Sequence, residues 1–207
     1  QSPEKIANMN AKSYEALRKK SRGKFSMVKF AQLKTLAKNT VGRSDAFLLK
    51  QMEITIDIEN QLDAKIDEIE SQILECIRAL NPPILTIPGI GELTAAIILS
   101  EYGNINKFEN PAQLLSFAGL EPGYYQSGLA EHQGHMVKHG SSHLRYALMN
   151  ACLPLITYEP VFAEYYAKKR AEGKPHRVAL THVAKKLLRV IFTLQTKNIS
   201  YDPTLIR

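Results

Sequence analysis

The chain has 207 residues, enough for one or two domains with a buried core, and a formal net charge of +7. It contains no run of about 18 apolar residues, so no segment is expected to span a membrane. Its two cysteines, Cys76 and Cys152, lie in apolar helical patterns, which argues against a disulfide framework and favours a reducing cytoplasm. The N-terminus lacks both a signal-peptide core and a methionine, so we expect the chain to be part of a longer protein.

The positive charge is unevenly distributed along the chain. Residues 1–43 carry eleven Lys/Arg and two Asp/Glu, residues 44–80 carry three and nine, and residues 81–207 carry thirteen and nine. A basic arm of +9 therefore precedes an acidic segment of −6 and a body of +4. The arm favours a polyanionic partner because bound phosphates release counterions, although a solvated basic surface is the alternative.

The N-terminal half is predicted to be helical. Short helices are expected at 11–20 and 27–39, and Ser44-Asp45 offers an N-cap for one long helix that ends near Leu80. Its apolar positions are Ile54, Ile58, Leu62, Ile66, Ile69, Ile73, Cys76 and Leu80. The later positions alternate in steps of three and four, as in a coiled coil, while the earlier steps of four form a stutter. This helix is expected to pack against a second copy or an antiparallel neighbour.

The remainder is predicted to be a compact helical domain. Asn81-Pro82-Pro83 ends the long helix, since neither proline donates a backbone hydrogen bond. Helices are expected near 92–102, 111–117, 142–157, 160–171 and 175–196, and residues 120–140 should form a loop or a small hairpin. The fold class is therefore mainly α. We divide the chain into a basic helical arm (1–43), a coiled-coil helix (44–80) and a helical domain (81–207).

A glycine-rich turn opens this domain. Ile87-Pro88-Gly89-Ile90-Gly91, followed by Leu93-Thr94-Ala95-Ala96, fits a helix–hairpin–helix, whose backbone amides at a helix N-terminus suit a phosphate oxygen. We therefore expect Gly89, Ile90 and Gly91 to bind nucleic acid, and Gly89→Val to weaken binding with the fold intact. The alternative is a tight turn that joins two packed helices and binds no phosphate.

A serine in a predicted turn is the candidate nucleophile. Gln126-Ser127-Gly128 is followed within twenty residues by Lys138, His139 and Arg145, which we expect to contact nucleic-acid phosphates. A serine that attacks phosphorus needs a base for its proton and cations or a metal for the developing charge. The sequence has no carboxylate between Glu131 and Glu159, so metal-binding acids are missing from this neighbourhood.

Two other patterns have simpler interpretations. His132, His135, His139 and His143 have tempting spacing, but Gly134 and Gly140 interrupt any shared helix, so no metal site is expected. On the last helix, Lys185, Lys186 and Arg189 lie opposite an apolar face. We interpret this as the solvated side of a core helix, with nucleic-acid contact as the alternative.

These motifs together resemble a known family. The elements are IPGIGELTAA, the Gly-Asn-Ile…Phe segment at 103–108, LLSFAGLEPGYYQSG, the run from Gly134 through Lys138 to Gly140, and LRYAL at 144–148. In this order they resemble the C-terminal half of the DEDD-type transposases of bacterial insertion sequences. This insertion-sequence "one-ten" family includes the pilin-gene invertases and the bridge-RNA-guided recombinases. The resemblance covers about residues 85–150, and the long helix lies where that family has its coiled coil.

The resemblance implies a function for the full-length protein. In that family a RuvC-like N-terminal domain supplies four metal-binding acids, which implies Mg²⁺, and the catalytic serine falls on Ser127 here. It further implies DNA as substrate, a structured guide RNA, a homo-oligomer (dimer or tetramer) and the bacterial cytoplasm. The RuvC-like half is absent from this sequence, so we expect this chain to hold no cofactor and to be inactive alone.

Three other functions remain as alternatives. A non-catalytic helix–hairpin–helix module with a dimerising helix would bind nucleic acid without strand exchange. A structural oligomerisation fragment would account for residues 44–80 but not for Gln126 to Arg145. A glycosylase is disfavoured because no catalytic Asp or Lys follows the turn at a plausible distance.

Overall fold

The computed structural model describes residues 2–41, 45–127, 130–136 and 139–206, with the side chains of 122–136 and 205–206 left aside. The chain divides into two compact units, an N-terminal unit of residues 1–67 and a C-terminal unit of residues 68–207. This division falls inside the long helix, whereas the sequence placed boundaries at residues 43 and 80. The difference arises because Ile77, near the end of that helix, is buried.

The basic arm forms a small helical cluster. It contains α1 (Pro3–Ala7), α2 (Ala11–Lys20) and α3 (Met27–Lys38), and it thereby confirms both predicted helices. Tyr14 and Phe30 are its buried aromatic residues, with ring centroids 5.4 Å apart. Lys34 Nζ donates to Met9 O at 2.7 Å and lies 5.8 Å from the Phe30 ring. The five-residue α1 went unpredicted because it has no apolar period; Ser2 caps it and Pro3 begins it.

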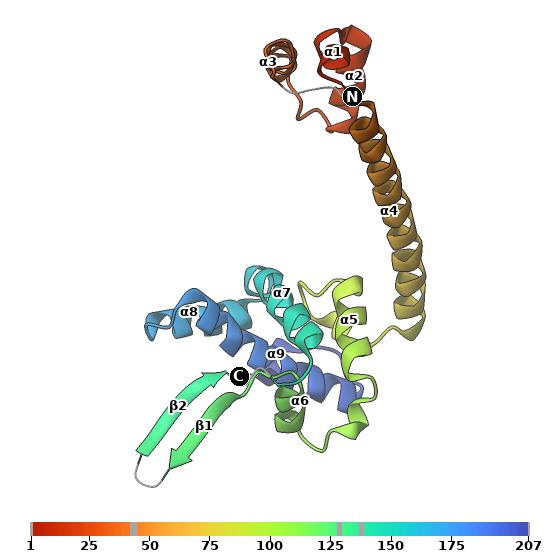
Figure 1. The fold of residues 1–207 in the computed structure, drawn as a ribbon. Coiled ribbons are helices and arrows are strands. Elements are labelled where there is room, and N and C mark those ends of the chain that lie inside the picture. The colour runs from red at the N-terminus through yellow and green to blue at the C-terminus, as the bar shows by residue number, and fades with distance from the viewer. Residues whose placement is uncertain (1, 42–44, 128–129, 137–138, 207) are drawn as a thin grey trace. The chain divides into compact units, whose positions relative to one another are not determined.

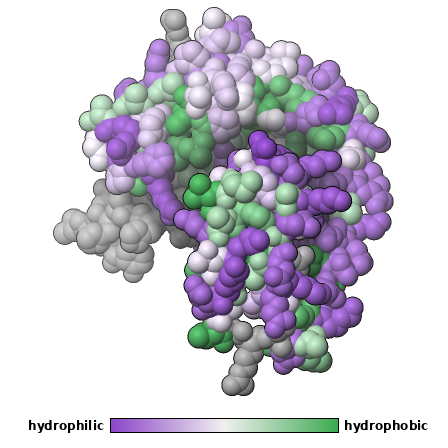
Figure 2. Space-filling model, turned by 90° about the horizontal axis from the view of Figure 1, so that it is seen from above, coloured by the Kyte–Doolittle hydropathy of each residue, from purple (hydrophilic) through white to green (hydrophobic). Residues whose placement is uncertain are grey.

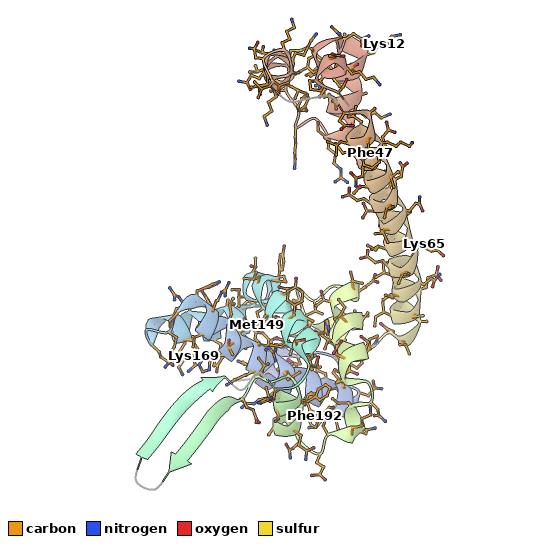
Figure 3. All side chains as sticks on the ribbon, viewed as in Figure 1. Lys12, Phe47, Lys65, Met149, Lys169 and Phe192 are labelled. Carbon is orange, nitrogen blue, oxygen red and sulfur yellow. The ribbon has the colours of Figure 1, made fainter. Side chains whose placement is uncertain are left out.

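The predicted long helix is confirmed as α4 (Ala46–Leu80). Asp45 Oδ1 accepts a hydrogen bond from Phe47 N at 2.7 Å, as expected near the N-terminus of the helix. The isoleucine and leucine side chains at 54, 58, 62, 66 and 69 are 50–59% exposed. Labelled side chains such as Phe47 and Lys65 project from the helix in Figure 3. Among the described residues of the N-terminal unit, therefore, no antiparallel neighbour covers the apolar positions from Ile54 to Ile66.

The C-terminal unit is a helical bundle with one hairpin (Figure 1). Its elements are η1 (Pro83–Thr86), α5 (Glu92–Tyr102), η2 (Ile105–Lys107), α6 (Pro111–Phe117), β1 (Pro122–Ser127), β2 (Ala130–Met136), α7 (Ser142–Tyr158), α8 (Pro160–Ala171), α9 (His176–Lys197) and η3 (Pro203–Ile206). The five helices predicted from the sequence are confirmed within two residues at each end. The mainly α fold class is confirmed as well.

Helix α9 forms the centre of this unit and contacts α6, α7, α8 and η1. Its apolar positions recur every three or four residues and are buried, so one face of the helix is enclosed. The largest fully buried side chains are Phe162, Ile84, Ile87, Ile98, Leu114, Leu120, Leu144, Leu148, Leu155, Leu187, Leu188 and Ile191. Outside the core, hydrophobic residues lie among hydrophilic ones on the surface seen in Figure 2.

Residues 120–140 contain the small hairpin that was one of the two expectations for this stretch. Strands β1 and β2 pair in antiparallel register, with Pro122 opposite Met136 at one end and Ser127 opposite Ala130 at the other. The register shifts between Pro122 and Tyr124, as in a β-bulge. No helix in the described part of the chain is both long and apolar enough to cross a membrane.

Candidate functional site

The glycine turn at residues 87–91 joins η1 to α5. Gly91 is the N-cap of α5, is exposed, and makes no side-chain cap hydrogen bond. The first amides of a helix have no intrahelical acceptor, and the positive end of the helix dipole lies there. Gly91 therefore presents the features expected of a phosphate contact. The element before the turn is a four-residue 3-10 helix, where a helix–hairpin–helix would have an α-helix.

Gly89 and Ile90 face the interior of the unit instead. Gly89 has φ +87°, and a Cβ placed on it would lie 2.9 Å from Pro154 C and 3.0 Å from Pro154 O in α7. Ile90 is only 7% exposed. The expectation that Gly89→Val leaves the fold intact is therefore wrong, because the added side chain would overlap the α7 backbone. The glycine is required here for helix packing.

A salt bridge stands beside the same helix N-terminus. Arg78 Nε and Nη2 donate to the two carboxylate oxygens of Glu92 at 2.8 and 2.7 Å. The hydrogen bond from Arg78 lowers the pKa of Glu92, whose carboxylate also lies favourably at the first turn of α5. This pair joins the end of α4 to α5. Arg78 is not among the site residues predicted from the sequence, since its partner is 14 residues away and no local pattern marks the pairing.

The segment 138–145 begins at the base of the hairpin. Lys138 lies outside the described residues. His139 is exposed and lines a surface depression of about 550 Å³ together with Lys107, Phe108 and Phe117. Gly140 has φ +110°, and a Cβ there would overlap Phe117 O and lie 2.9 Å from Phe117 C. His139 is thus available to a ligand, whereas Gly140 is required by its contact with α6.

Arg145 also has a structural role. Its Nη1 donates to Ala118 O, the carbonyl just after α6, at 3.0 Å. Ser141 caps α7 by accepting from Leu144 N at 2.9 Å, and its hydroxyl donates to Glu101 Oε2 at 2.5 Å. These bonds fasten α7 to α5 and to the chain that leads into β1. Arg145 therefore holds the base of the hairpin, and its guanidinium is only half-buried.

Ser127 lies at the other end of the hairpin. It is the last residue of β1 and pairs with Ala130, while Gly128 and the side chain of Ser127 are not described. Five strand steps of about 3.4 Å separate it from Pro122, a distance of about 17 Å. Met136 pairs with Pro122, so His139 and Arg145 follow the base of the hairpin. The structure thus separates the candidate nucleophile from these two side chains, although the sequence places them within twenty residues.

The four histidines considered as metal ligands lie on different elements. His132 and His135 belong to β2, His139 precedes Gly140, and His143 lies in the first turn of α7. Among the described residues, no group of three or more His, Cys, Asp or Glu side chains could hold a metal ion.

The segment that carries the glycine turn and the hairpin is similar in sequence to one class of protein, the transposases of insertion sequences. Residues 81–167 match the model of the family described as "Transposase IS116/IS110/IS902 family". This segment of the chain is similar to that family, and it includes the turn, the hairpin, all of α7 and most of α8.

Curated relatives agree with this assignment. The chain is 32% identical over 136 residues to an insertion element IS110 protein of Streptomyces coelicolor, covering 65% of this chain and 34% of the relative. It is 30% identical over 151 residues to the pilin gene-inverting protein of Moraxella bovis (70% and 46%). It is 28% identical over 157 residues to the transposase for insertion sequence element IS1111A of Coxiella burnetii (74% and 41%). The chain thus spans between a third and a half of the length of these relatives.

Proposed function

We propose that this chain is the C-terminal part of a DNA transposase or recombinase in which Ser127 is the nucleophile for phosphodiester strand exchange. The observation that carries the proposal is the family match over residues 81–167, which contains a hairpin whose first strand ends at Ser127. A residue beside a hairpin turn, about 17 Å from the base, is well placed to enter a site formed by another domain or subunit.

The proposed reaction is a transesterification, in which one phosphodiester bond is exchanged for another. Ser127 Oγ attacks phosphorus and gives its proton to a base, while the bond from phosphorus to the deoxyribose oxygen breaks and that oxygen takes up a proton. The DNA strand remains attached to Ser127 as a phosphodiester until the hydroxyl of a second strand displaces the serine.

The distance between Ser127 and the hairpin base affects how this charge is stabilised. His139 and Arg145 follow the base, so cations for the developing negative charge at phosphorus come from elsewhere in the full-length assembly. Mg²⁺ would be held by acids of a RuvC-like domain outside this chain.

Substitution of Ser127 in the full-length protein tests the proposal. Ser127→Ala should abolish strand exchange and leave folding unchanged, with Ser116→Ala on the exposed face of α6 as the matched control. A covalent protein–DNA adduct, trapped on a denaturing gel, should map by mass spectrometry to the peptide that contains Ser127. An adduct on another residue, or full recombination by Ser127→Ala, would refute the assignment. Nucleic-acid binding without any adduct would favour the non-catalytic module.

We also propose that the chain binds nucleic acid through its basic arm and the N-terminus of α5 at Gly91. Support comes from the +9 charge of residues 1–43 and the exposed, uncapped position of Gly91. Gly91→Asp should weaken binding by repelling phosphate while it caps α5, whereas Gly91→Ser caps α5 without a charge. Equal binding by both variants would remove Gly91 from the interface. DNA is the expected substrate, and the resemblance to RNA-guided members suggests a guide RNA as a further partner.

Self-association through α4 is the remaining part of the proposal. The C-terminal unit has an apolar groove of about 800 Å³, and α4 has exposed apolar side chains in each of the two units. The groove is lined by Ile69, Ile73, Cys76 and Leu80 from α4 and by Leu93, Ala96 and Ile97 from α5, among others. An apolar surface of this length is stabilised when a second copy covers it, which supports a dimer or tetramer.

A further inference from the structure

Most of the positively charged residues of the C-terminal unit lie outside the segment that carries the glycine turn and the hairpin. Residues 81–159, which carry the glycine turn and the hairpin, contain three Lys/Arg and six Asp/Glu. Residues 160–197, which form α8, α9 and their connection, contain nine Lys/Arg and two Asp/Glu. The mild overall charge of the domain therefore conceals a strongly basic pair of helices.

The cations of the two helices converge on one aromatic ring. Lys169 Nζ of α8 lies 5.6 Å from the ring centroid of Tyr165, and Lys186 Nζ of α9 lies 5.0 Å from the same centroid. Lys186 Nζ is also 5.5 Å from the Phe162 ring. Cation–π contacts of this kind hold long side chains in defined positions. Figure 3 labels Lys169 on α8, beside the helix that carries Lys186.

The two acidic residues in this region leave most of the positive charge uncompensated. Glu172 pairs with Lys169 at 2.9 Å, and Glu164 acts on Lys186. Desolvation and the charges of Lys169, Lys185 and Lys174 nevertheless lower the pKa of His182, against an opposing effect of Glu172. The pKa of Lys185 is lowered by desolvation and by Arg189, one helical turn further along. A positive potential thus extends over α8 and α9.

One row of these side chains leads to the hairpin. His182, Lys185 and Arg189 are spaced by three and four residues on α9 and so share a face over about 10 Å. That length matches about three phosphates of one DNA strand, at about 3.4 Å of helix axis each. Glu121, the residue before β1, acts electrostatically on Lys185, so this row passes near the base of the hairpin.

We propose that an α8–α9 surface, made of five cationic side chains and one imidazole (Lys169, Lys174, His182, Lys185, Lys186 and Arg189), binds the phosphate backbone of a nucleic-acid duplex. This inference rests on the proposed function, in which the chain acts on nucleic acid. All six residues lie beyond residues 81–167, where the family match ends. Backbone contact is independent of sequence, so the surface would hold the duplex while other parts of the protein select the site.

Fluorescence anisotropy with a labelled 30-base-pair DNA duplex, and with RNA of the same sequence, tests this surface. Lys185→Gln/Arg189→Gln should weaken binding about tenfold or more at 0.1 M salt and lower the salt-dependence slope for DNA by about 1.8. The control Lys50→Gln/Lys197→Gln removes the same net charge from the start of α4 and the end of α9. It should change the affinity far less. If the variant loses affinity for only one of the two duplexes, that duplex is the one that this surface binds.

A second readout follows His182 itself. Bound phosphates would offset the surrounding cations, so the pKa of His182, followed by its ring-proton NMR signal, should rise when the DNA duplex is added. Assignment of the signal by His182→Asn separates it from the other histidines. A pKa that does not move with saturating duplex would contradict the proposal.

The remaining outcomes separate this inference from the proposed function. If the wild-type chain binds no duplex even at low salt, nucleic-acid binding by this chain fails, and the inference with it. If the wild type binds and the variant and control weaken binding equally, only the α8–α9 proposal is overturned. If the variant changes self-association but not duplex binding, the surface contacts a second copy, whose α4 is acidic, and the proposal is again overturned.

Discussion

Helices α4 and α9 have similar amphipathic sequences and opposite surroundings. Both repeat apolar residues every three or four positions, yet α9 buries that face against α6, α7 and α8, while α4 leaves it half exposed. Burial of one Leu or Ile side chain stabilises by about 1.5 to 3 kcal/mol, and α4 gains this only when something covers it. A repeat of apolar residues every three or four positions therefore predicts a helix with one covered face, but it does not predict which chain covers that face.

The sharpest way to test the comparison is to truncate one leucine in each helix. Leu188→Ala removes a fully buried side chain from α9 and should lower the free energy of unfolding by about 2 to 5 kcal/mol. Leu62→Ala, at a position 59% exposed in α4, should have little effect in dilute solution. Urea unfolding at low protein concentration measures both. Equal losses would mean that α4 is already covered.

Substitutions of the two glycines in the turn compare a buried backbone position with an exposed one. Gly89→Val should destabilise the C-terminal unit by more than about 2 kcal/mol, because its φ is positive and its Cβ would overlap α7. Gly91→Ala, with open space around its Cβ, should change stability by less than about 1 kcal/mol. Thermal unfolding followed by circular dichroism compares the two. A stable Gly89→Val protein would contradict the packing described for the turn.

Charged residues placed at the apolar positions of α4 should change self-association without unfolding the chain. Ile66→Asp/Ile73→Asp would put two carboxylates into an apolar interface, which is unfavourable without partners for their charge. Light scattering should then report a lower molar mass than for the wild type, with unchanged helicity. Glu68→Asp in the same stretch serves as a mild control. A wild-type protein that is monomeric at high concentration would instead exclude self-pairing.

The two cysteines report on the same contrast. Cys152 is fully buried, and its burial raises the pKa of the thiol to about 12. Since the thiolate is the reactive form, Cys152 should resist alkylation at pH 8, whereas the exposed Cys76 should react. Cys76 lies at one of the apolar positions of α4. If a second copy covers these positions, the labelling of Cys76 should slow as the protein concentration rises. Mass spectrometry of labelled peptides follows both. Concentration-independent labelling of Cys76 would argue that this end of α4 stays uncovered.

The smallest expected effect comes from the pair between Glu92 and Arg78. The folded-state pKa of Glu92 is lowered, so its contribution to stability is present at neutral pH. This contribution is lost as the pH falls below the ordinary glutamate pKa of about 4.3 and then through the lowered pKa of Glu92. Urea midpoints of wild type and Arg78→Gln should therefore converge on acidification. Both groups are exposed to solvent, so the difference at neutral pH should be small.

The sequence predicted the helices well because their ends are fixed by nearby residues. Pro111 and Asn110 begin α6, and Asn81-Pro82 follows α4, so each boundary is readable within a few positions. The contacts of Gly89 with Pro154 and of Arg145 with Ala118 connect distant segments, and no local pattern announces them. A residue that looks like a ligand contact in the sequence can therefore prove to be a packing contact.

The candidate site was predicted less completely. Ser127 and His139 were identified from their motif, but an intervening hairpin separates them, which depends on strand pairing from Ser127 to Met136. Lys185, Lys186 and Arg189 were interpreted as the solvated side of a core helix, with nucleic-acid contact as the alternative. The charge of residues 81–207 as a whole is only +4, and this average hides the basic character of α8 and α9.

The hairpin has the geometry of a lever arm, with Ser127 at one end and its base at the other. Gly140 against Phe117 and Arg145 on the Ala118 carbonyl set the direction in which β1 leaves the helical unit. Because the arm is about 17 Å long, a rotation of about 20° at the base would displace Ser127 by about 6 Å. Small changes in how α6 and α7 meet are thus amplified at the serine, and the precision of its delivery depends on residues remote from it.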